Sequence, residues 1–209
     1  AAGGFEKPVW TIEYPEHSHP DSRLAHAVVL SDAFSNGGFV VGLWGMNNTS
    51  GPRYEVNREY YGLAGDYRPL FTRRDQIADV AVVWNFPSHY WRSFSVLRTG
   101  VANQGLVSNF SRMLEDLHIP YETTIFGHRD VFDDSAQLQR LERYRVIIVP
   151  AADCMSDRHA RLLKRLARSG ATVVLVGETG TRDEDYSPRE RPALADVLGE
   201  ESGGRLAFG

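Results

Sequence analysis

Residues 144–176, YRVIIVPAADCMSDRHARLLKRLARSGATVVLV, decide the fold of this chain. The two apolar runs in this stretch, VIIVP and TVVLV, show no alternation of polar and apolar residues, which is typical of strands buried on both faces of a parallel sheet. Between them, Ser156 can cap a helix from Asp157 to Arg168, and Gly170 can stop it. A strand, a helix and a strand of these lengths predict one crossover connection in a parallel sheet.

The same alternation of strands and helices continues toward the N-terminus. The predicted elements are the strand Asp79 to Trp84, the helix Gly105 to Leu117, the strand Tyr121 to Phe126, the helix Ser135 to Glu142 and the strand Tyr144 to Pro150. The first of these helices has the apolar stripe of a face that is buried on a sheet, with Leu106, Phe110, Met113, Leu114 and Leu117. Together the patterns predict an α/β fold with a doubly wound parallel sheet.

A shorter unit of strand, helix and strand is predicted nearer the N-terminus. Its elements are the strand Pro8 to Glu13, a helix that begins at Asp21 or Ser22 and has Leu24, Val28 and Phe34 near one face, and the strand Phe39 to Trp44. The carboxyl ends of the two strands then lie on the same side of a parallel pair. Residues 45–74 lack a long apolar period and predict a loop with a short helix around residues 59–63.

These patterns predict a domain boundary near residues 72–76, with residues 1–74 in one domain and residues 75–209 in another. The tail from Glu178 onward has one weak helical pattern, around residues 192–198, and otherwise predicts loose structure. The chain begins with Ala1 rather than Met and opens close to a predicted strand, so we expect its N-terminus to be a cut inside a longer protein.

Composition excludes several classes of function. The formal net charge is −4, with 23 Lys and Arg scattered among 27 Asp and Glu, so the chain lacks the basic stripe that nucleic-acid binding requires. Apolar runs stay far below the roughly 18 residues of a membrane span, which predicts that no membrane is a partner. The single cysteine, Cys154, cannot form an internal disulfide, which leaves the compartment open and favours the cytoplasm.

Loops that follow the strands decide between an enzyme and a scaffold, because ligands bind beyond the carboxyl ends of parallel strands. Cys154 follows a strand but has no flanking Gly, whereas a nucleophile elbow needs Gly on a sharp turn and a nearby His as base. We therefore interpret it as a packed thiol. The Gly177 to Gly180 loop can seat an anion on its backbone N–H groups, and the preferred interpretation is a tight exit from the strand. No phosphate-binding glycine motif occurs, so no cofactor is predicted.

Short segments in a particular order resemble the trimerisation domain of family 42 β-galactosidases, over about residues 79–199. The segments are DVAVVW at 79–84, SHYW at 88–91, LEDLHIP at 114–120, YRVIIVP at 144–150, MSD at 155–157, SGAT at 169–172 and ETG at 178–180. The resemblance implies a flavodoxin-like sheet of the class I glutamine-amidotransferase kind, without amidotransferase chemistry, that assembles a homotrimer. It also implies further strands after Gly209, so the second domain would be incomplete in this chain.

The first segment resembles the seventh and eighth strands of a glycosidase barrel. Glu13 ends its strand and is the candidate nucleophile of a retaining enzyme, in which two carboxylates lie about 5–5.5 Å apart. A loop or surface carboxylate is the alternative. Trp44 ends the next predicted strand, where its ring can stack beneath a carbohydrate substrate or pack in a core. Because two strands cannot close a barrel, we predict that this chain alone does not hydrolyse glycosides.

No metal site is predicted. Glu16, His17 and His19 look like ligands, but they stand in a polar loop flanked by Pro, where solvated surface is the preferred interpretation, and the cysteines that hold zinc in some family members are absent.

Self-association is the first functional hypothesis. Phe86, Tyr90, Trp91 and Phe94 form the candidate contact patch, because large rings supply contact area at low entropic cost, although they can equally fold back over a barrel. A parent glycosidase with Glu13 as nucleophile is the enzyme hypothesis. The alternative is a free-standing amidotransferase-like module that binds a small ligand near Cys154 and Glu178 without catalysis.

Overall fold

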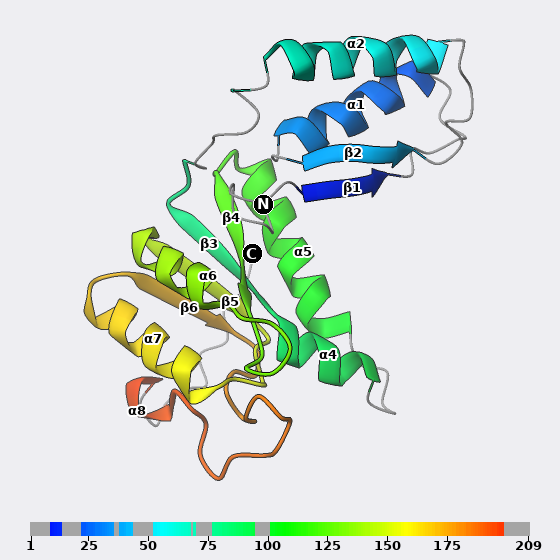
Figure 1. Ribbon diagram of the computed structural model, residues 1–209. Helices are drawn as coiled ribbons and strands as arrows, with labels where there is room; N and C mark the ends of the chain where they lie inside the picture. Colours follow the sequence, from blue (N-terminus) through cyan, green and yellow to red (C-terminus); the bar gives the residue numbers. More distant parts are fainter. Residues whose placement is uncertain are drawn as a thin grey trace. The chain divides into compact units, whose positions relative to one another are not determined.

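The computed structural model describes residues 9–13, 22–35, 38–43, 52–67, 69, 77–94 and 101–198 (Figure 1). The chain divides into two compact units, Ala1–Gln76 and Ile77–Gly209. Each unit has its own hydrophobic core.

The first unit contains two parallel strands and two helices. Its elements are β1 (Val9–Glu13), α1 (Ser22–Ser35), β2 (Gly38–Leu43) and α2 (Pro52–Asp66). β1 and β2 pair in parallel, with Glu13 in register with Leu43. The predicted unit of strand, helix and strand is therefore present.

Two details of the first unit differ from the sequence prediction. α1 buries Leu30, Ala33 and Phe34, whereas Leu24 and Val28 are exposed on its other side. The predicted loop contains the helix α2 over Pro52–Asp66, because Val56, Tyr60 and Ala64 recur every four positions and pack against α1. This spacing was the signal that the prediction missed.

The second unit is built on a parallel sheet whose described strands number four. They are β3 (Val80–Asn85), β4 (Tyr121–Phe126), β5 (Val146–Pro150) and β6 (Thr172–Val176), in the order β4-β3-β5-β6. All neighbouring pairs are parallel. The doubly wound α/β fold class predicted from the sequence is confirmed.

Helices cover both faces of this sheet (Figure 1). On one face α5 (Val101–Asp116) packs its Phe110 and Leu114 against Val80 and Val82 of β3. On the other face lie α6 (Ser135–Arg140), the 3₁₀ turn Leu141–Arg143 and α7 (Asp157–Arg168), which cover Ala81 and Val83. Because successive residues of a strand point to opposite faces, the continuous apolar run of β3 supplies both cores.

Two predictions about loops in the second unit were wrong. Residues Phe86–Phe94 form the helix α4, which the Asn85 side chain caps by accepting a hydrogen bond from the Ser88 N–H at 2.8 Å. The described part of the tail is ordered rather than loose, because its backbone hydrogen-bonds to the loop after β5 and to itself before ending in α8 (Ala195–Leu198). Gly180 N–H, for example, donates to the Ala152 carbonyl at 2.8 Å.

Candidate functional site

The crevice between the carboxyl ends of β3 and β5 is where this type of sheet usually binds its ligand, because the chain connections diverge there. In this protein that strand-end crevice is filled by Asn85, Ser88 and Cys154. The Asn85 amide donates to the Cys154 carbonyl at 2.9 Å, and the Cys154 N–H donates to Ser88 Oγ at 3.0 Å. All three residues are buried, and these donors and acceptors bind each other rather than a ligand.

Cys154 is unsuited to nucleophilic catalysis. Its side chain is fully buried, and burial, reinforced by the negative charge of Asp153, raises the pKa of the thiol to about 12. The nearby Ser88 hydroxyl and the charges of Arg92 and Arg182 oppose this rise but do not cancel it. A thiol with this pKa is almost wholly protonated at neutral pH, so it provides no thiolate for attack.

The space between Cys154 and Glu178 is likewise closed by side chains. Arg92 of α4 reaches over the loop after β5 and pairs with the buried Asp153 at 3.1 Å, and it lies 4.0 Å from the exposed Glu178. Gly177 and Gly180 both have positive φ, which produces the tight exit from β6. Because Gly180 N–H already donates within the protein, this loop does not present it to an anion.

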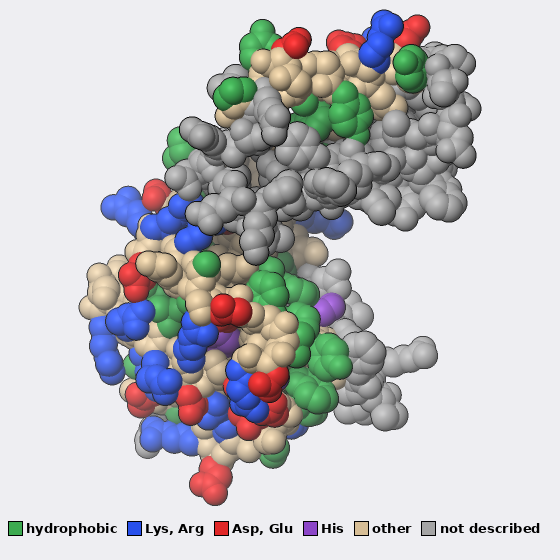
Figure 2. Space-filling view, in the orientation of Figure 1, with side chains coloured by type: hydrophobic (Ala, Val, Ile, Leu, Met, Phe, Trp, Pro, Cys, Tyr) green, Lys and Arg blue, Asp and Glu red, His purple; other side chains and the backbone are tan. Residues whose placement is uncertain are grey.

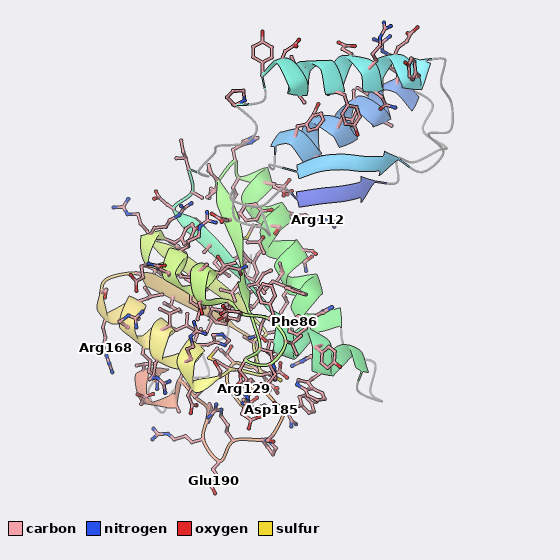
Figure 3. The ribbon with its side chains drawn as sticks, viewed as in Figure 1. Phe86, Arg112, Arg129, Arg168, Asp185 and Glu190 are labelled. Carbon is pink, nitrogen blue, oxygen red and sulfur yellow. The ribbon has the colours of Figure 1, made fainter. Side chains whose placement is uncertain are left out.

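An aromatic surface lies on α4, immediately beside the closed crevice. Phe86 stacks on Tyr90 at a centroid distance of 5.8 Å, and Tyr90 meets the edge of Trp91 at 5.4 Å. Tyr90 is 43% exposed. In Figure 2 hydrophobic side chains gather on the side of the second unit where Figure 1 draws α4, and Figure 3 labels Phe86 at the start of this helix. The side chain of Phe94, the fourth predicted contact residue, lies outside the described residues.

The C-terminal loop, residues 181–189, packs against this aromatic surface. Tyr186 stacks on Trp91 at 6.0 Å, and the guanidinium of Arg182 lies 4.2 Å from the centre of the Tyr186 ring on which it packs. The Trp91 indole also donates to the Glu184 carbonyl at 3.1 Å. Sequence analysis missed Arg182 and Tyr186, because they stand in a tail with no periodic pattern.

Charged residues of the loop after β4 fasten the C-terminal loop. Arg129 pairs with Glu184 at 2.6 Å and with Asp185, and His128 lies 3.1 Å from Asp185. Figure 3 shows Arg129 and Asp185 close together at the base of the unit. The hydrogen bond from Arg129, with a further one from His128, lowers the pKa of Asp185, so this carboxylate is charged at neutral pH.

A polar cleft of about 570 Å³ opens beside this ion-pair cluster. We call it the charged cleft, and its walls come from residues 127–134, 156–161 and 183–189. At its back, the buried Asp134 accepts from His159 Nε2 at 2.6 Å and from the Gly127 N–H at 2.7 Å. The His159 ring stacks on Phe126 at 4.3 Å. Sequence analysis did not find this pair, because single polar residues 25 positions apart leave no local pattern.

The candidate residues of the first unit are described only in part. Glu13 is the last residue of β1, and its side chain lies outside the described part of the structure, as do Trp44 and the segment with Glu16, His17 and His19. Within the described residues, no group of three or more His, Cys, Asp and Glu is arranged to hold a metal ion. Over the same residues, no helix has the length and apolar character of a membrane span.

Comparison with known proteins supports the resemblance seen in the sequence. Residues 78–203 match the family described as β-galactosidase trimerisation domain. Among solved structures, a catalytic mutant of Gan42B, a GH42 β-galactosidase from G. stearothermophilus, is similar with a TM-score of 0.62 and 15% identity, over 88% of this chain and 34% of that chain. A further Gan42B structure has a TM-score of 0.59 and 16% identity, over 80% and 26% of the two chains.

A third solved structure, the β-galactosidase from Bifidobacterium adolescentis, has 19% identity and a TM-score of 0.43, over 53% of this chain and 46% of that chain. This chain therefore spans less than half the length of each of these three solved structures. No curated protein matches the chain by sequence.

Proposed function

The chain belongs to the β-galactosidase trimerisation domain family, and from this premise we propose that its second unit joins copies of a β-galactosidase-like glycoside hydrolase into a homotrimer. The observation that carries the proposal is the family match over residues 78–203 in a unit whose strand-end crevice is closed. A sheet whose usual ligand site is occupied by hydrogen bonds between its own residues is suited to a structural role.

We propose α4 as the contact surface. One continuous aromatic cluster consists of Phe86, Tyr90 and Trp91. The ring of Tyr186 stacks on Trp91. Aromatic residues with restricted side chains are enriched at the centre of protein interfaces, because they bury large areas with little loss of rotamer freedom. Phe94 extends the same helix by one further turn and completes the proposed set.

Light scattering of the purified chain over a range of concentrations tests the association. We expect the mass of a trimer at high concentration and its loss in Tyr90→Glu, since burying a carboxylate in an aromatic contact is costly. Tyr54→Glu is a matched control, because Tyr54 is a tyrosine of α2 with 41% exposure, close to the 43% of Tyr90. A chain that stays monomeric at every concentration, or equal dissociation of both variants, would contradict the proposal.

The first unit is proposed to be the end of a glycosidase barrel. Its two parallel strands place the backbone of Glu13 in register with Leu43, which precedes Trp44 in the sequence. This arrangement supports Glu13 as nucleophile of a retaining enzyme and Trp44 as floor of the site for a carbohydrate substrate. The acid/base carboxylate would come from another part of such a barrel.

An assay of an aryl β-galactoside tests this part of the proposal. We expect no turnover by the chain alone, because its described strands supply one candidate carboxylate at a strand end and catalysis needs two. Hydrolysis by the wild-type chain that disappears in Glu13→Gln would overturn the expected inactivity while supporting the role of Glu13.

The alternative of a ligand-binding module centred on Cys154 and Glu178 has little support. Cys154 is fully buried, and Arg92 closes the approach to it by pairing with Asp153. A ligand would have to break a buried ion pair and buried hydrogen bonds, which costs several kcal/mol, on the order of 2–5.

A further inference from the structure

The outer part of the C-terminal loop, residues 183–187, is a compact turn that we call the loop tip. Just before it, the Arg182 backbone both donates to and accepts from the loop after β5, at 2.9 and 3.0 Å. Within the loop tip, the Asp183 carboxylate accepts from the N–H groups of Asp185 and Ser187 at 3.0 and 2.8 Å. The turn therefore has a fixed base, and its side chains decide how it packs against the rest of the second unit.

Tyr186, in the loop tip, has a left-handed backbone conformation. Its φ is 73°, a region that residues with a side chain adopt only at a cost in free energy. Such strain persists where surrounding contacts offset it, and it is common at functional positions. The Tyr186 ring stacks on Trp91, and the Arg182 guanidinium packs on the same ring and donates to the Tyr186 carbonyl at 3.0 Å. These contacts keep the strained turn against the aromatic surface of α4.

Glu184 joins the charged contacts of the loop tip to its aromatic contacts. The Glu184 carboxylate pairs with Arg129 at 2.6 Å, and the Glu184 carbonyl accepts from the Trp91 indole at 3.1 Å. The Glu184 side chain is only 13% exposed, so this pair is partly shielded from solvent. Arg129 also pairs with the neighbouring Asp185 (Figure 3). An arginine of the loop after β4 thus fixes the residue that holds the Trp91 indole.

We propose that the loop tip is a strap that holds Trp91 in the conformation required for self-association, with Arg129 as its positioning residue. This inference rests on the proposed function, in which α4 is the contact surface between copies of the chain. Trp91 in turn supports the exposed Tyr90, whose ring meets its edge. A surface that is fixed before association loses less conformational freedom on binding. Release of the loop tip therefore weakens association, although Arg129 itself lies outside α4.

Ionic strength distinguishes a strap built on ion pairs from an aromatic contact alone. Salt screens the pairs of Arg129 with Glu184 and Asp185, because the Arg129 side chain is largely exposed. The formal net charge of the chain is −4, so salt also screens the repulsion between copies, which by itself favours association. Weaker association at high salt is therefore the sign that the strap predicts.

Light scattering of the full chain over a range of concentrations, at low and at high sodium chloride, tests the proposal. We expect Arg129→Ala to weaken association by about threefold for each chain, in keeping with the small free energies of exposed ion pairs. A trimer contains three loop tips, so its association constant should fall by about thirtyfold. Salt should weaken association of the wild type but not of Arg129→Ala. Arg165→Ala is the matched control, because it removes the same charge from an exposed pair with Glu142.

Hydrogen exchange of the Trp91 indole N–H, followed by NMR, tests the strap without relying on trimers. The signal is assigned with Trp91→Phe and measured in a Tyr90→Glu background, which keeps the chain monomeric under the proposed function. We expect faster exchange when Arg129→Ala is added and no change when Arg165→Ala is added, because the indole donates to the residue that Arg129 fixes.

The two measurements separate failure of the strap from failure of the proposed function. Trimers that are equally stable in the wild type and in Arg129→Ala, or unchanged indole exchange, would overturn the strap and leave the proposed function standing. A wild-type chain that stays monomeric would overturn the proposed function and the role of the strap in association. Faster indole exchange in Arg129→Ala would still support the hold of the loop tip on Trp91.

Discussion

Of two hollows at the same edge of the sheet in the second unit, one is filled by side chains and the other is open. The strand-end crevice between β3 and β5 is closed by Asn85, Ser88 and Cys154, whose polar atoms bind one another in the interior. The charged cleft next to it stays open, although it also has a buried polar pair, Asp134 and His159, at its back. Position at the edge of the sheet therefore does not decide whether side chains fill a hollow.

The two hollows also differ in how their hydrogen-bond donors and acceptors are paired. In the strand-end crevice the described donors and acceptors of Asn85 and Cys154 satisfy each other across two loops, and the Arg92–Asp153 pair covers them. In the charged cleft Arg189 pairs with Asp157 while its buried Nε has no partner, and beside the crevice the buried Oδ1 of Asp153 has none either.

The largest expected effect concerns the closed crevice and the reactivity of Cys154. Because the thiol pKa is about 12 instead of 9.0, the thiolate fraction falls by about a thousandfold, and burial slows the reaction further. We expect a maleimide to label the folded chain at least about a thousandfold more slowly than the chain unfolded in urea. The measurement follows one site only, since Cys154 is the single cysteine. Rapid labelling of the folded chain would show that the crevice opens.

At the back of the charged cleft, Asp134→Ala is expected to lower the free energy of unfolding by about 3 kcal/mol, because it leaves two buried donors, His159 Nε2 and the Gly127 N–H, without an acceptor. Urea denaturation measures the loss. Asp133→Ala is the control, since the neighbouring Asp133 is exposed and should cost much less. Equal losses would show that the Asp134 cluster has no special role.

The same cluster predicts a dependence of stability on pH. Burial raises the pKa of Asp134, but the hydrogen bonds from His159 and Gly127 and the charges of His159 and Arg158 outweigh it, so the pKa is lowered overall. Its contribution is present above the unfolded pKa of about 4 and is lost as the pH falls through the folded pKa. Asp134→Asn should remove this part of the acid destabilisation, which denaturation at several pH values would reveal. An unchanged pH profile would contradict the assignment.

In the closed crevice, Asn85→Ala is expected to cost about 2 kcal/mol, because the Cys154 carbonyl loses its amide donor and the start of α4 loses its cap. The comparison variant is Asn109→Ala, on the exposed side of α5. Urea denaturation of both variants gives the difference. If Asn85→Ala is no less stable than Asn109→Ala, hydrogen bonding does not close the crevice.

The smallest effect is expected for Arg129→Ala. Its ion pairs with Glu184 and Asp185 are largely exposed, and such pairs add little to global stability. The local effect should be faster hydrogen exchange at the Asp185 and Ser187 amides, with the overall unfolding transition unchanged. Arg165→Ala, which breaks an exposed pair with Glu142, should leave these amides unaffected. Raised salt should also speed hydrogen exchange at these amides in the wild type, because it screens the ion pairs of Arg129.

Local patterns were sufficient for most of the second unit. The helix Asp157–Arg168, its Ser156 cap and the positive φ of Gly170 agree with the prediction, and the strand Tyr121–Phe126 has the predicted bounds. Each rests on residues that lie close together in the chain. The helix α4 was missed because its cap, Asn85, was taken for the start of a loop and its aromatic residues for loop side chains.

The sequence alone determined the parallel α/β architecture and the absence of a cysteine elbow, because strand burial, helix periodicity and glycine turns are properties of short segments. Only the tertiary structure decided which polar residues meet. Asp134 and His159, Arg129 and Asp185, and Trp91 and Tyr186 come from segments far apart in the sequence. The pairing of such residues depends on how the loops pack over the sheet edge, and no local period records it.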